Sequence, residues 1–225
     1  MISVIIPALN EEKALPATLA RVLAEKSDCE IIVVDGGSRD RTCEIVKATP
    51  RVSLLSAPRG RASQMNAGAR VASGEWLLFL HADTLLPPGA LARLKTLEGD
   101  HSCQAGGFRQ HFSGRHWGLR LISWLHNIRC WNTGIIYGDQ AMFVRRTLFE
   151  RLGGFPEKPI LEDIAFCDKL VAVTKPKLLG EHVITDSRKF TQMGIWRSLM
   201  RCALILICYE LRLPIAGRAF FSDVR

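Results

Sequence analysis

The sequence lacks the features that mark several classes of protein. Its seven cysteines are odd in number and include no CxxC pair, so neither a zinc cluster nor a disulfide framework is indicated. We expect buried thiols in a reducing cytoplasm instead. No run approaches the roughly 20 consecutive apolar residues that a membrane-spanning helix needs. Residues 1–7 have no basic region and no cleavage site, so we do not expect a signal peptide.

Negative charge is comparatively scarce. The 225 residues include 30 Lys and Arg but 22 Asp and Glu, which gives a formal net charge of +8. This balance suits an anionic partner such as nucleotide phosphates, an anionic membrane face or nucleic acid. Because no recognised nucleic-acid-binding motif occurs, we do not expect a nucleic-acid partner. The length and the 48% hydrophobic content suffice for one sizeable α/β domain, without internal repeats.

Residues 74–84 are the stretch around which we expect the fold to be organised. Residues 76–80 are apolar without alternation, which predicts a central strand covered on both faces. The strand ends in His81 and Asp83. Because ligands of open α/β sheets bind outside the carboxyl ends of the strands, we expect both side chains at the mouth of a site. A carboxylate there could hold a divalent metal, although Asp83 could also cap a turn or the helix that begins near residue 87.

Two strand–loop–helix units precede this stretch. Residues 2–6 predict a strand closed by a proline, followed by a helix over residues 12–25 whose start is capped by residues 10–12. Residues 31–34 predict a second strand, followed by Asp35, two glycines and a helix over residues 43–48. At the strand end, Asp35 could accept hydrogen bonds from a base or ribose, whereas we interpret Asp40 as a helix cap.

The third unit carries two arginines. A strand over residues 52–55 leads into residues 58–68, where small residues open a helix beside Arg59 and Arg61. Guanidinium groups and helix N-terminal amides both suit a diphosphate. We assign that role to Arg61, because Arg59 could simply be solvated.

The composition of the sequence changes between residues 106 and 131, where aromatic and basic residues are interspersed. Apolar residues at helical spacing fit one face of a helix with a basic opposite face. The residues of this face are Trp117, Leu121, Trp124, Leu125 and Ile128. The face could pack onto the domain, lie on a membrane, line an acceptor groove or contact another subunit.

Further polar side chains lie between residues 137 and 170. Residues 137–146 predict a polar turn that feeds a strand, in which Asp139 and Gln140 could hydrogen-bond substrate hydroxyls or stabilise the turn. Glu162 and Asp163 are the first residues of a predicted helix that runs to residue 170. The helix dipole stabilises an acid at this position, so one of the two acids needs no catalytic role to account for it. We place Asp168 on the solvated face of that helix.

The end of the sequence predicts a strand and a helical tail. Residues 178–184 form the predicted strand, in which His182 is more simply structural than a metal ligand. Arg188 and its neighbour offer two cations that could stabilise a departing diphosphate. Residues 195–215 predict a helix too short to span a bilayer, docked either onto the domain or onto a membrane surface.

Four segments together resemble the family 2 glycosyltransferases of GT-A fold: residues 3–11, 33–42, 60–68 and 80–84. The resemblance covers about the first 150 residues in order. More narrowly, residues 81–84 (His-Ala-Asp-Thr), 137–140 and 222–225 are similar to a small bacterial subgroup. The resemblance implies an α/β fold with a mostly parallel central sheet flanked by helices and a helical C-terminal portion. It implies one domain over residues 1–225, with a nucleotide-sugar half (1–105), an acceptor and catalytic half (106–190) and a helical tail (191–225).

The resemblance also implies a site. A nucleoside diphosphate sugar of UDP or GDP type would be bound by these residues: Pro7, Glu11 and Asp35 around the nucleoside, with Arg61 and Arg188 near the diphosphate. Asp83 would bind a divalent metal, Mn²⁺ or Mg²⁺. His81 replaces the first acid of the family's Asp-x-Asp element and could bond the ribose or bind a softer metal.

The implied reaction is inverting glycosyl transfer to a hydroxyl acceptor, with a lipid or a polysaccharide precursor among the candidates. Glu162 and Asp163 match the family's catalytic acids, with Asp163 as general base, and Asp139 and Gln140 would bind the acceptor. We expect the protein in the cytoplasm or at the inner face of the cell membrane. Two alternatives remain at this point: a non-catalytic protein that binds nucleotide sugars, and a sugar-phosphate nucleotidyltransferase.

Overall fold

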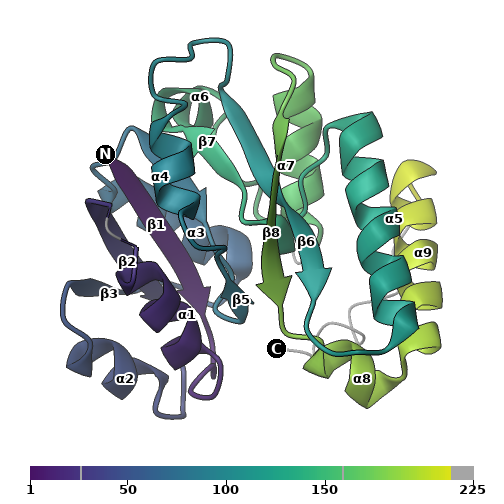
Figure 1. Cartoon of the computed structure of the whole chain (residues 1–225), viewed down its shortest axis with the longest axis horizontal. Helices are drawn as coiled ribbons and strands as arrows, with labels where there is room; N and C mark the ends of the chain where they lie inside the picture. The colour runs from purple at the N-terminus through teal and green to yellow at the C-terminus, as the bar shows by residue number, and fades with distance from the viewer. Residues whose placement is uncertain (26, 159, 214–225) are drawn as a thin grey trace.

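The computed structural model describes residues 1–25, 27–158 and 160–213, which form one curled sheet between helices (Figure 1). The sheet has eight strands in the order β3-β2-β1-β4-β7-β6-β8-β5. The strands are β1 (Ile2–Ala8), β2 (Cys29–Asp35), β3 (Val52–Ser56), β4 (Trp76–Phe79), β5 (Thr84–Leu85), β6 (Ala105–Phe112), β7 (Phe143–Arg145) and β8 (Lys177–Thr185). The β1–β2, β2–β3, β1–β4 and β6–β8 pairs are parallel, and the pairs that involve β7 or β5 are antiparallel. A mostly parallel α/β sheet was predicted and is confirmed.

Helices cover both faces of the sheet. They are α1 (Leu15–Leu23), α2 (Thr42–Ala48), α3 (Arg61–Val71), α4 (Ala90–Lys95), α5 (Trp117–Thr133), α6 (Arg146–Arg151), α7 (Glu162–Val171), α8 (Arg188–Met193) and α9 (Ile195–Glu210), with the short 3₁₀ helix η1 (Gly138–Gln140). One core cluster joins the sheet to α1, α2 and α4, and a second joins it to α3, α6 and α7. In Figure 1, α5, α8 and α9 lie together at the end of the molecule beyond β6.

The central strand β4 is buried on both faces, as its unbroken apolar run predicted. Trp76 and Leu78 pack into one core cluster, whereas Leu77 and Phe79 pack into the other. Successive side chains of a strand point to opposite faces. Because both faces are covered, the sequence shows no alternation, and the polar residues appear only where the strand ends.

The first helix begins later than predicted. It was expected over residues 12–25, yet α1 spans Leu15–Leu23, with a proline in its first turn. Residues 10–12 do not cap it, because they are used by the loop after β2. The amide of Asn10 donates to Ser38 Oγ at 2.9 Å, and the amide of Glu12 donates to Asp40 Oδ2 at 3.1 Å. Asp40 also accepts from the amide of Thr42 at 3.0 Å, so it contacts the first residue of α2, although the N-cap residue is Arg41 rather than Asp40.

The helix α5 forms, but its buried side is not the predicted apolar face. Leu119, Ile122 and Cys130 are buried, whereas Trp117 and Trp124 are 62% and 58% exposed. Packing onto the domain is therefore wrong for those two tryptophans. The side that meets β6 and α9 carries small residues such as Gly118, where an added Cβ would lie 3.0 Å from Ile195 Cγ2. Small residues let the backbone approach closely, and the large aromatic residues then remain outside.

The C-terminal helix α9 ends at Glu210, earlier than the expected residue 215. The tail beyond residue 213 and the segment 222–225 lie outside the described residues. Within the part of the chain that the structure describes, no helix combines the length and apolarity needed to cross a bilayer.

Candidate active site

Two adjoining cavities open where β1 and β4 end. The larger, about 220 Å³, is here called the acidic cavity, and one end of it is lined by Arg61, His81, Asp83, Asp139, Glu162 and Asp163. The smaller, about 70 Å³, is here called the loop cavity, and it is lined by Pro7, Glu11, Arg59, Arg61 and Gln64 among others. Arg61, His81 and Asp83 line both. Residues from five separate parts of the chain therefore line two adjoining cavities.

The carboxylate of Asp163 is fixed by two backbone amides. Its Oδ2 accepts a hydrogen bond from the amide of Gly138 at 2.7 Å, and its Oδ1 accepts from the amide of Ile164 at 2.8 Å. A Cβ at position 138 would lie 2.7 Å from His81 Nε2 and 3.3 Å from Asp163 Oδ2. Gly138 therefore packs directly between His81 and Asp163, and any larger residue would push them apart.

Arg61 connects helix α3, of which it is the first residue, to the acids of α7. Its Nη1 lies 3.2 Å from Oε1 of Glu162, a side chain that is 1% exposed. Burial acts to lower the pKa of the Arg61 guanidinium, but the carboxylates of Glu162, Asp163, Asp83 and Asp139 raise it above its ordinary value. Arg61 therefore stays charged at the centre of the acid cluster.

Asp139 is an acid of the cluster whose carboxyl pKa is raised. Burial, followed by the charges of Asp163 and Asp83, raises the pKa of its carboxyl to about 7. The residue precedes β7 in η1, and its backbone carbonyl accepts from Thr185 Oγ1 at 3.3 Å. The acidic side chains that line the cavity outnumber the basic ones, because Arg61 is accompanied by Asp83, Asp139, Glu162, Asp163 and Asp186.

This excess of negative charge fits a divalent cation. Asp83 supplies an oxygen ligand of the kind that Mg²⁺ and Mn²⁺ prefer, and His81 stands beside it at the end of β4. Among the described residues, no group of three or more His, Cys, Asp or Glu side chains is close enough to hold a metal by itself. A cation bound at Asp83 would therefore take its other ligands from a substrate diphosphate and water.

In the loop cavity, two predicted substrate residues contact each other. Arg188 Nη2 donates to Glu11 Oε2, and Arg188 Nε also lies 3.6 Å from Asp186 Oδ2. Burial acts to lower the pKa of Arg188, but the Glu11 carboxylate raises it. Arg59 lines this cavity too, and it is exposed to solvent there. The arginine pair was visible in the sequence, but the position of Arg59 relative to the cavity was not.

Two other predicted residues do not reach either cavity. Asp35 lies at the carboxyl end of β2, but its carboxylate accepts from the amides of Gly37 and Ser38 at 2.9 and 3.1 Å. Gln140 is fully buried, and its Oε1 accepts from the amide of Tyr137 at 2.8 Å. Of the predicted acceptor pair, Asp139 faces the cavity and Gln140 closes the turn behind it.

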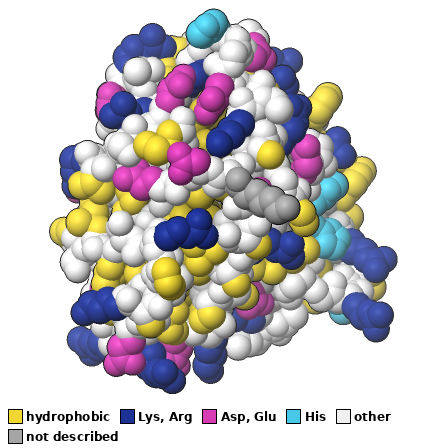
Figure 2. Space-filling view, turned by 60° about the vertical axis from the view of Figure 1, so that its left-hand side comes forward, with side chains coloured by type: hydrophobic (Ala, Val, Ile, Leu, Met, Phe, Trp, Pro, Cys, Tyr) yellow, Lys and Arg dark blue, Asp and Glu magenta, His cyan; other side chains and the backbone are white. Residues whose placement is uncertain are grey.

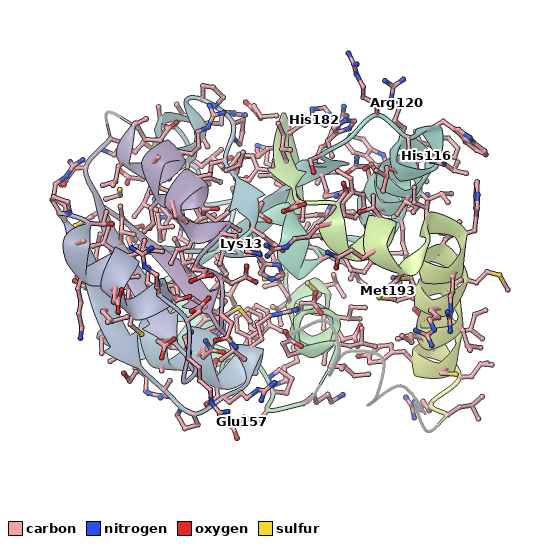
Figure 3. All side chains as sticks on the ribbon, turned by 90° about the horizontal axis from the view of Figure 1, so that it is seen from below. Lys13, His116, Arg120, Glu157, His182 and Met193 are labelled. Carbon is pink, nitrogen blue, oxygen red and sulfur yellow. The ribbon has the colours of Figure 1, made fainter. Side chains whose placement is uncertain are left out.

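His182 lines neither of the two cavities. His182, which is labelled in Figure 3, lines a separate groove with Arg109 and Trp124, and Asp83 does not line that groove. Figure 2 shows Lys and Arg side chains interspersed with Asp and Glu on the face turned toward the viewer. On this face the net positive charge is therefore spread out rather than gathered in one patch.

Comparisons with a family model and with known proteins agree on the family of this chain. A family model described as Glycosyl transferase family 2 matches residues 3–153. A PGL/p-HBAD biosynthesis glycosyltransferase of Mycobacterium bovis is 34% identical over 170 residues, which cover 69% of this chain and 63% of the relative. An undecaprenyl-phosphate 4-deoxy-4-formamido-L-arabinose transferase of Pseudomonas aeruginosa is 31% identical over 169 residues, covering 68% and 49%. The chain thus spans less than two thirds of the length of these relatives.

Solved structures show the same fold. TarS of S. aureus, residues 1–349 in complex with UDP-GlcNAc, superposes with a TM-score of 0.67 at 20% identity, over 83% of this chain and 58% of that one. The mannosyltransferase PcManGT of Pyrobaculum calidifontis, in complex with GDP-Man and Mn²⁺, superposes with a TM-score of 0.62 at 23% identity, over 81% and 56%. The GT-A-type α/β fold implied by the sequence motifs is confirmed.

Proposed function

The chain belongs to glycosyl transferase family 2, and from this premise we propose that it is an inverting, metal-dependent glycosyltransferase. It would move a sugar from a nucleoside diphosphate sugar to a hydroxyl acceptor. The observation that carries the proposal is that Arg61, Asp83 and Asp163, from three distant segments, line one cavity that adjoins the loop after β1. The UDP-GlcNAc and GDP-Man bound to the structural relatives support a donor of UDP or GDP type.

The first half of the chain, residues 1–105, would bind the donor. The loop cavity lies at the carboxyl ends of β1 and β4, the usual ligand position in an open α/β sheet. Pro7 and Glu11 would surround the nucleoside, and the Asp35 turn adjoins them, because the Gly36 amide donates to the carbonyl of Ala8 at 3.0 Å. Arg59 and Arg61 would face the diphosphate. Arg188, from the opposite end of the chain, reaches the same cavity through Glu11 and would close it over the donor.

The metal would be held at Asp83, with His81 as its neighbour. When bound, a Mn²⁺ or Mg²⁺ ion would offset the charge that accumulates on the departing diphosphate. Support comes from the raised pKa of Asp139, which burial and the nearby Asp163 and Asp83 charges bring to about 7. The Mn²⁺ in the PcManGT complex supports the same type of ion.

Asp163 would act as the general base on the acceptor side, residues 106–190. Its carboxylate is oriented by the amides of Gly138 and Ile164 and lines the acidic cavity. It would take the proton from the acceptor hydroxyl while that oxygen attacks the anomeric carbon opposite the leaving diphosphate. Attack from that side inverts the configuration. Glu162 would hold Arg61 in place rather than touch the reacting atoms.

The proposed location is the inner face of a membrane, because two helices expose apolar stripes. On α9, the outward side chains are 46% to 74% exposed: Trp196, Met200, Leu204 and Ile207. On α5, Trp117, Trp124 and Trp131 are exposed by 58% to 66%. The α5 segment contains no Asp or Glu, and α9 contains only Glu210, which pairs with Arg129 at 2.9 Å. Tryptophans and basic residues without acids suit an anionic lipid surface.

A thermal-shift experiment tests the donor and metal parts together. UDP or GDP should raise the melting temperature only when MnCl₂ is present, because a ligand that binds the folded state stabilises it, by about 2.7 kcal/mol at 100 times its Kd. Asp83→Ala should abolish that rise. An equal shift without metal, or an unchanged shift in Asp83→Ala, would remove Asp83 from the metal site.

The catalytic part is tested with Asp163→Asn. This variant should keep the metal-dependent shift but lose donor hydrolysis and transfer by at least about 100-fold, the usual contribution of a general base. Asp168→Asn, on the same helix α7 but on its exposed side, should keep full activity. Wild-type turnover in Asp163→Asn would disprove the base role. Nucleotide binding by the wild type without hydrolysis or transfer over a broad panel would instead indicate a non-catalytic binding protein.

A further inference from the structure

The end of the acidic cavity away from the carboxylates is apolar. It is lined by Phe112, His126, Tyr137, Phe190, Met193, Ser198 and Cys202, which we call the apolar arm. These side chains come from β6, α5, the residue before η1, α8 and α9. Figure 3 shows Met193 beside α9, on the side that faces the body of the molecule. The arm continues the same cavity that begins at Asp163, so one ligand can occupy both ends.

Four rings form a continuous wall along the arm. The ring centroids of Phe190 and Phe112 are 4.6 Å apart, and those of Phe112 and His126 are 6.5 Å apart. His126 then stacks on Tyr137 at 4.8 Å with an interplanar angle of 18°. Aromatic side chains provide large apolar surfaces with defined geometry. The wall therefore offers a continuous apolar surface to a ligand in the cavity.

The arm carries no ionised side chain at neutral pH. Burial, with a smaller contribution from the Arg129 charge, lowers the pKa of His126 to about 4. Burial raises the pKa of the Cys202 thiol to about 11, with a smaller contribution from Asp139. Arg129 itself points to Glu210 and the Tyr137 hydroxyl. A charged ligand group would meet no counter-charge in the arm.

Two polar atoms of the arm have no hydrogen-bond partner among the described residues. They are Ser198 Oγ and His126 Nδ1, both buried, and Ser198 as a residue is only 3% exposed. A buried polar group without a partner costs about 1–3 kcal/mol. A ligand that places one polar atom along an otherwise apolar group would satisfy one of them. This is the second observation, besides the wall, that indicates a bound molecule.

We propose that the apolar arm binds the apolar part of the acceptor. The acceptor would place its hydroxyl at Asp163 and carry an aliphatic or aromatic group, within about one sugar ring of that hydroxyl, along the wall formed by Phe112 and Phe190. The inference rests on the proposed function, because it needs the acceptor hydroxyl at Asp163. It selects a lipid or aryl-bearing acceptor over a free sugar or a polysaccharide end, which would leave the arm empty.

The test compares three glucosides that differ only in the attached group. Binding of methyl, phenyl and n-octyl β-D-glucopyranoside is measured by calorimetry with UDP and MnCl₂ present, below micellar concentrations. The phenyl or octyl compound should bind at least tenfold more tightly than the methyl compound, because its apolar surface is buried. Tightest binding of the octyl compound indicates a lipid acceptor, and tightest binding of the phenyl compound indicates an aryl acceptor.

Variants localise the effect. Phe190→Ala shortens the wall and should reduce the preference for the phenyl or octyl compound over the methyl compound to less than threefold. Ser198→Ala provides a second, conservative change in the arm. Met200→Ala is the matched control, since Met200 lies on the outer side of α9 and is 74% exposed. Equal affinities for the three compounds, or a preference unchanged in Phe190→Ala, would overturn the inference. The metal-dependent shift with UDP or GDP is measured on the same samples and decides the proposed function separately.

Discussion

Nη1 of Arg61, the first residue of α3, lies 3.2 Å from Oε1 of Glu162, the first residue of α7. The two residues are 101 positions apart in the sequence, and each stands at the start of a helix. This contact joins α3 to α7, the helix that carries Asp163, and fixes their relative position. The ion pair thus connects the expected donor side of the site to its catalytic side.

Arg61→Ala should therefore reduce stability and donor binding together. Removing one partner of a buried ion pair leaves the other charge unpaired, and we expect a loss of about 2 kcal/mol in the free energy of unfolding. This loss is smaller than the one expected for a fully buried ion pair, because the Arg61 side chain is 30% exposed. Urea unfolding measures it, and the metal-dependent shift with UDP or GDP should disappear.

Two comparisons check this interpretation. Adding Glu162→Gln to Arg61→Ala should restore most of the lost stability, because the uncompensated carboxylate is gone. Arg70→Ala, on the exposed side of the same helix, should change neither stability nor binding. If the double variant is no more stable than Arg61→Ala alone, the ion pair is not the cause of the loss.

Gly138→Ala should impair activity with little change in the fold. The added Cβ would lie 2.7 Å from His81 Nε2 and 3.3 Å from Asp163 Oδ2, so at least one of these side chains must move. A displacement of this size in a catalytic group typically costs on the order of 100-fold in rate. Donor hydrolysis and transfer assays measure the loss. Gly99→Ala, where no atom lies within 4 Å of the new Cβ, should behave as the wild type.

His126 should make stability depend on pH. Burial and Arg129 lower its folded-state pKa to about 4, whereas in the unfolded chain it keeps an ordinary value of about 6.5. Above pH 6.5 the ring is neutral in both states, so stability is fully present there. As the pH falls from about 6.5 to 4, the unfolded chain takes up the proton and the folded state loses roughly 1–3 kcal/mol.

Urea unfolding of the wild type and His126→Phe over this pH range measures that loss. The stability difference between the two proteins should shift in favour of His126→Phe as the pH falls, because the variant has no ring to protonate. Other titrating groups cancel in the difference. A difference that is constant from pH 4 to 7 would show that His126 has an ordinary pKa.

The exposed tryptophans of α5 should bind the protein to anionic vesicles. At low salt, flotation with phosphatidylglycerol vesicles should recover the protein, and phosphatidylcholine vesicles should recover much less. Trp124→Ser combined with Trp131→Ser should reduce recovery several-fold because apolar insertion is lost. Val173→Ser, at a residue 53% exposed outside α5 and α9, serves as the control. Full recovery of the double variant, or none of the wild type, would contradict the proposed membrane face.

The sequence by itself determined the first three strand–helix units, the two-sided burial of β4 and the polar residues at its end, but it did not predict β5 or β6. Apolar runs and turn residues are local signals, so they can be read without the fold. Asp83, Arg61 and the acids at 162 and 163 were identified in the same way, from motifs that occupy a few consecutive residues. Their common cavity was an expectation that follows from the family's fold.

Only the tertiary structure decided which side of α5 is covered, which arginine meets Glu162, and that Gln140 turns away from the cavity. Periodicity shows which residues share a face of a helix, but which face is buried depends on how closely a distant element can approach. The aromatic wall of the apolar arm joins β6, α5, α8 and the residue before η1. No local pattern encodes such a wall, because its contacts form only when those separate elements pack together.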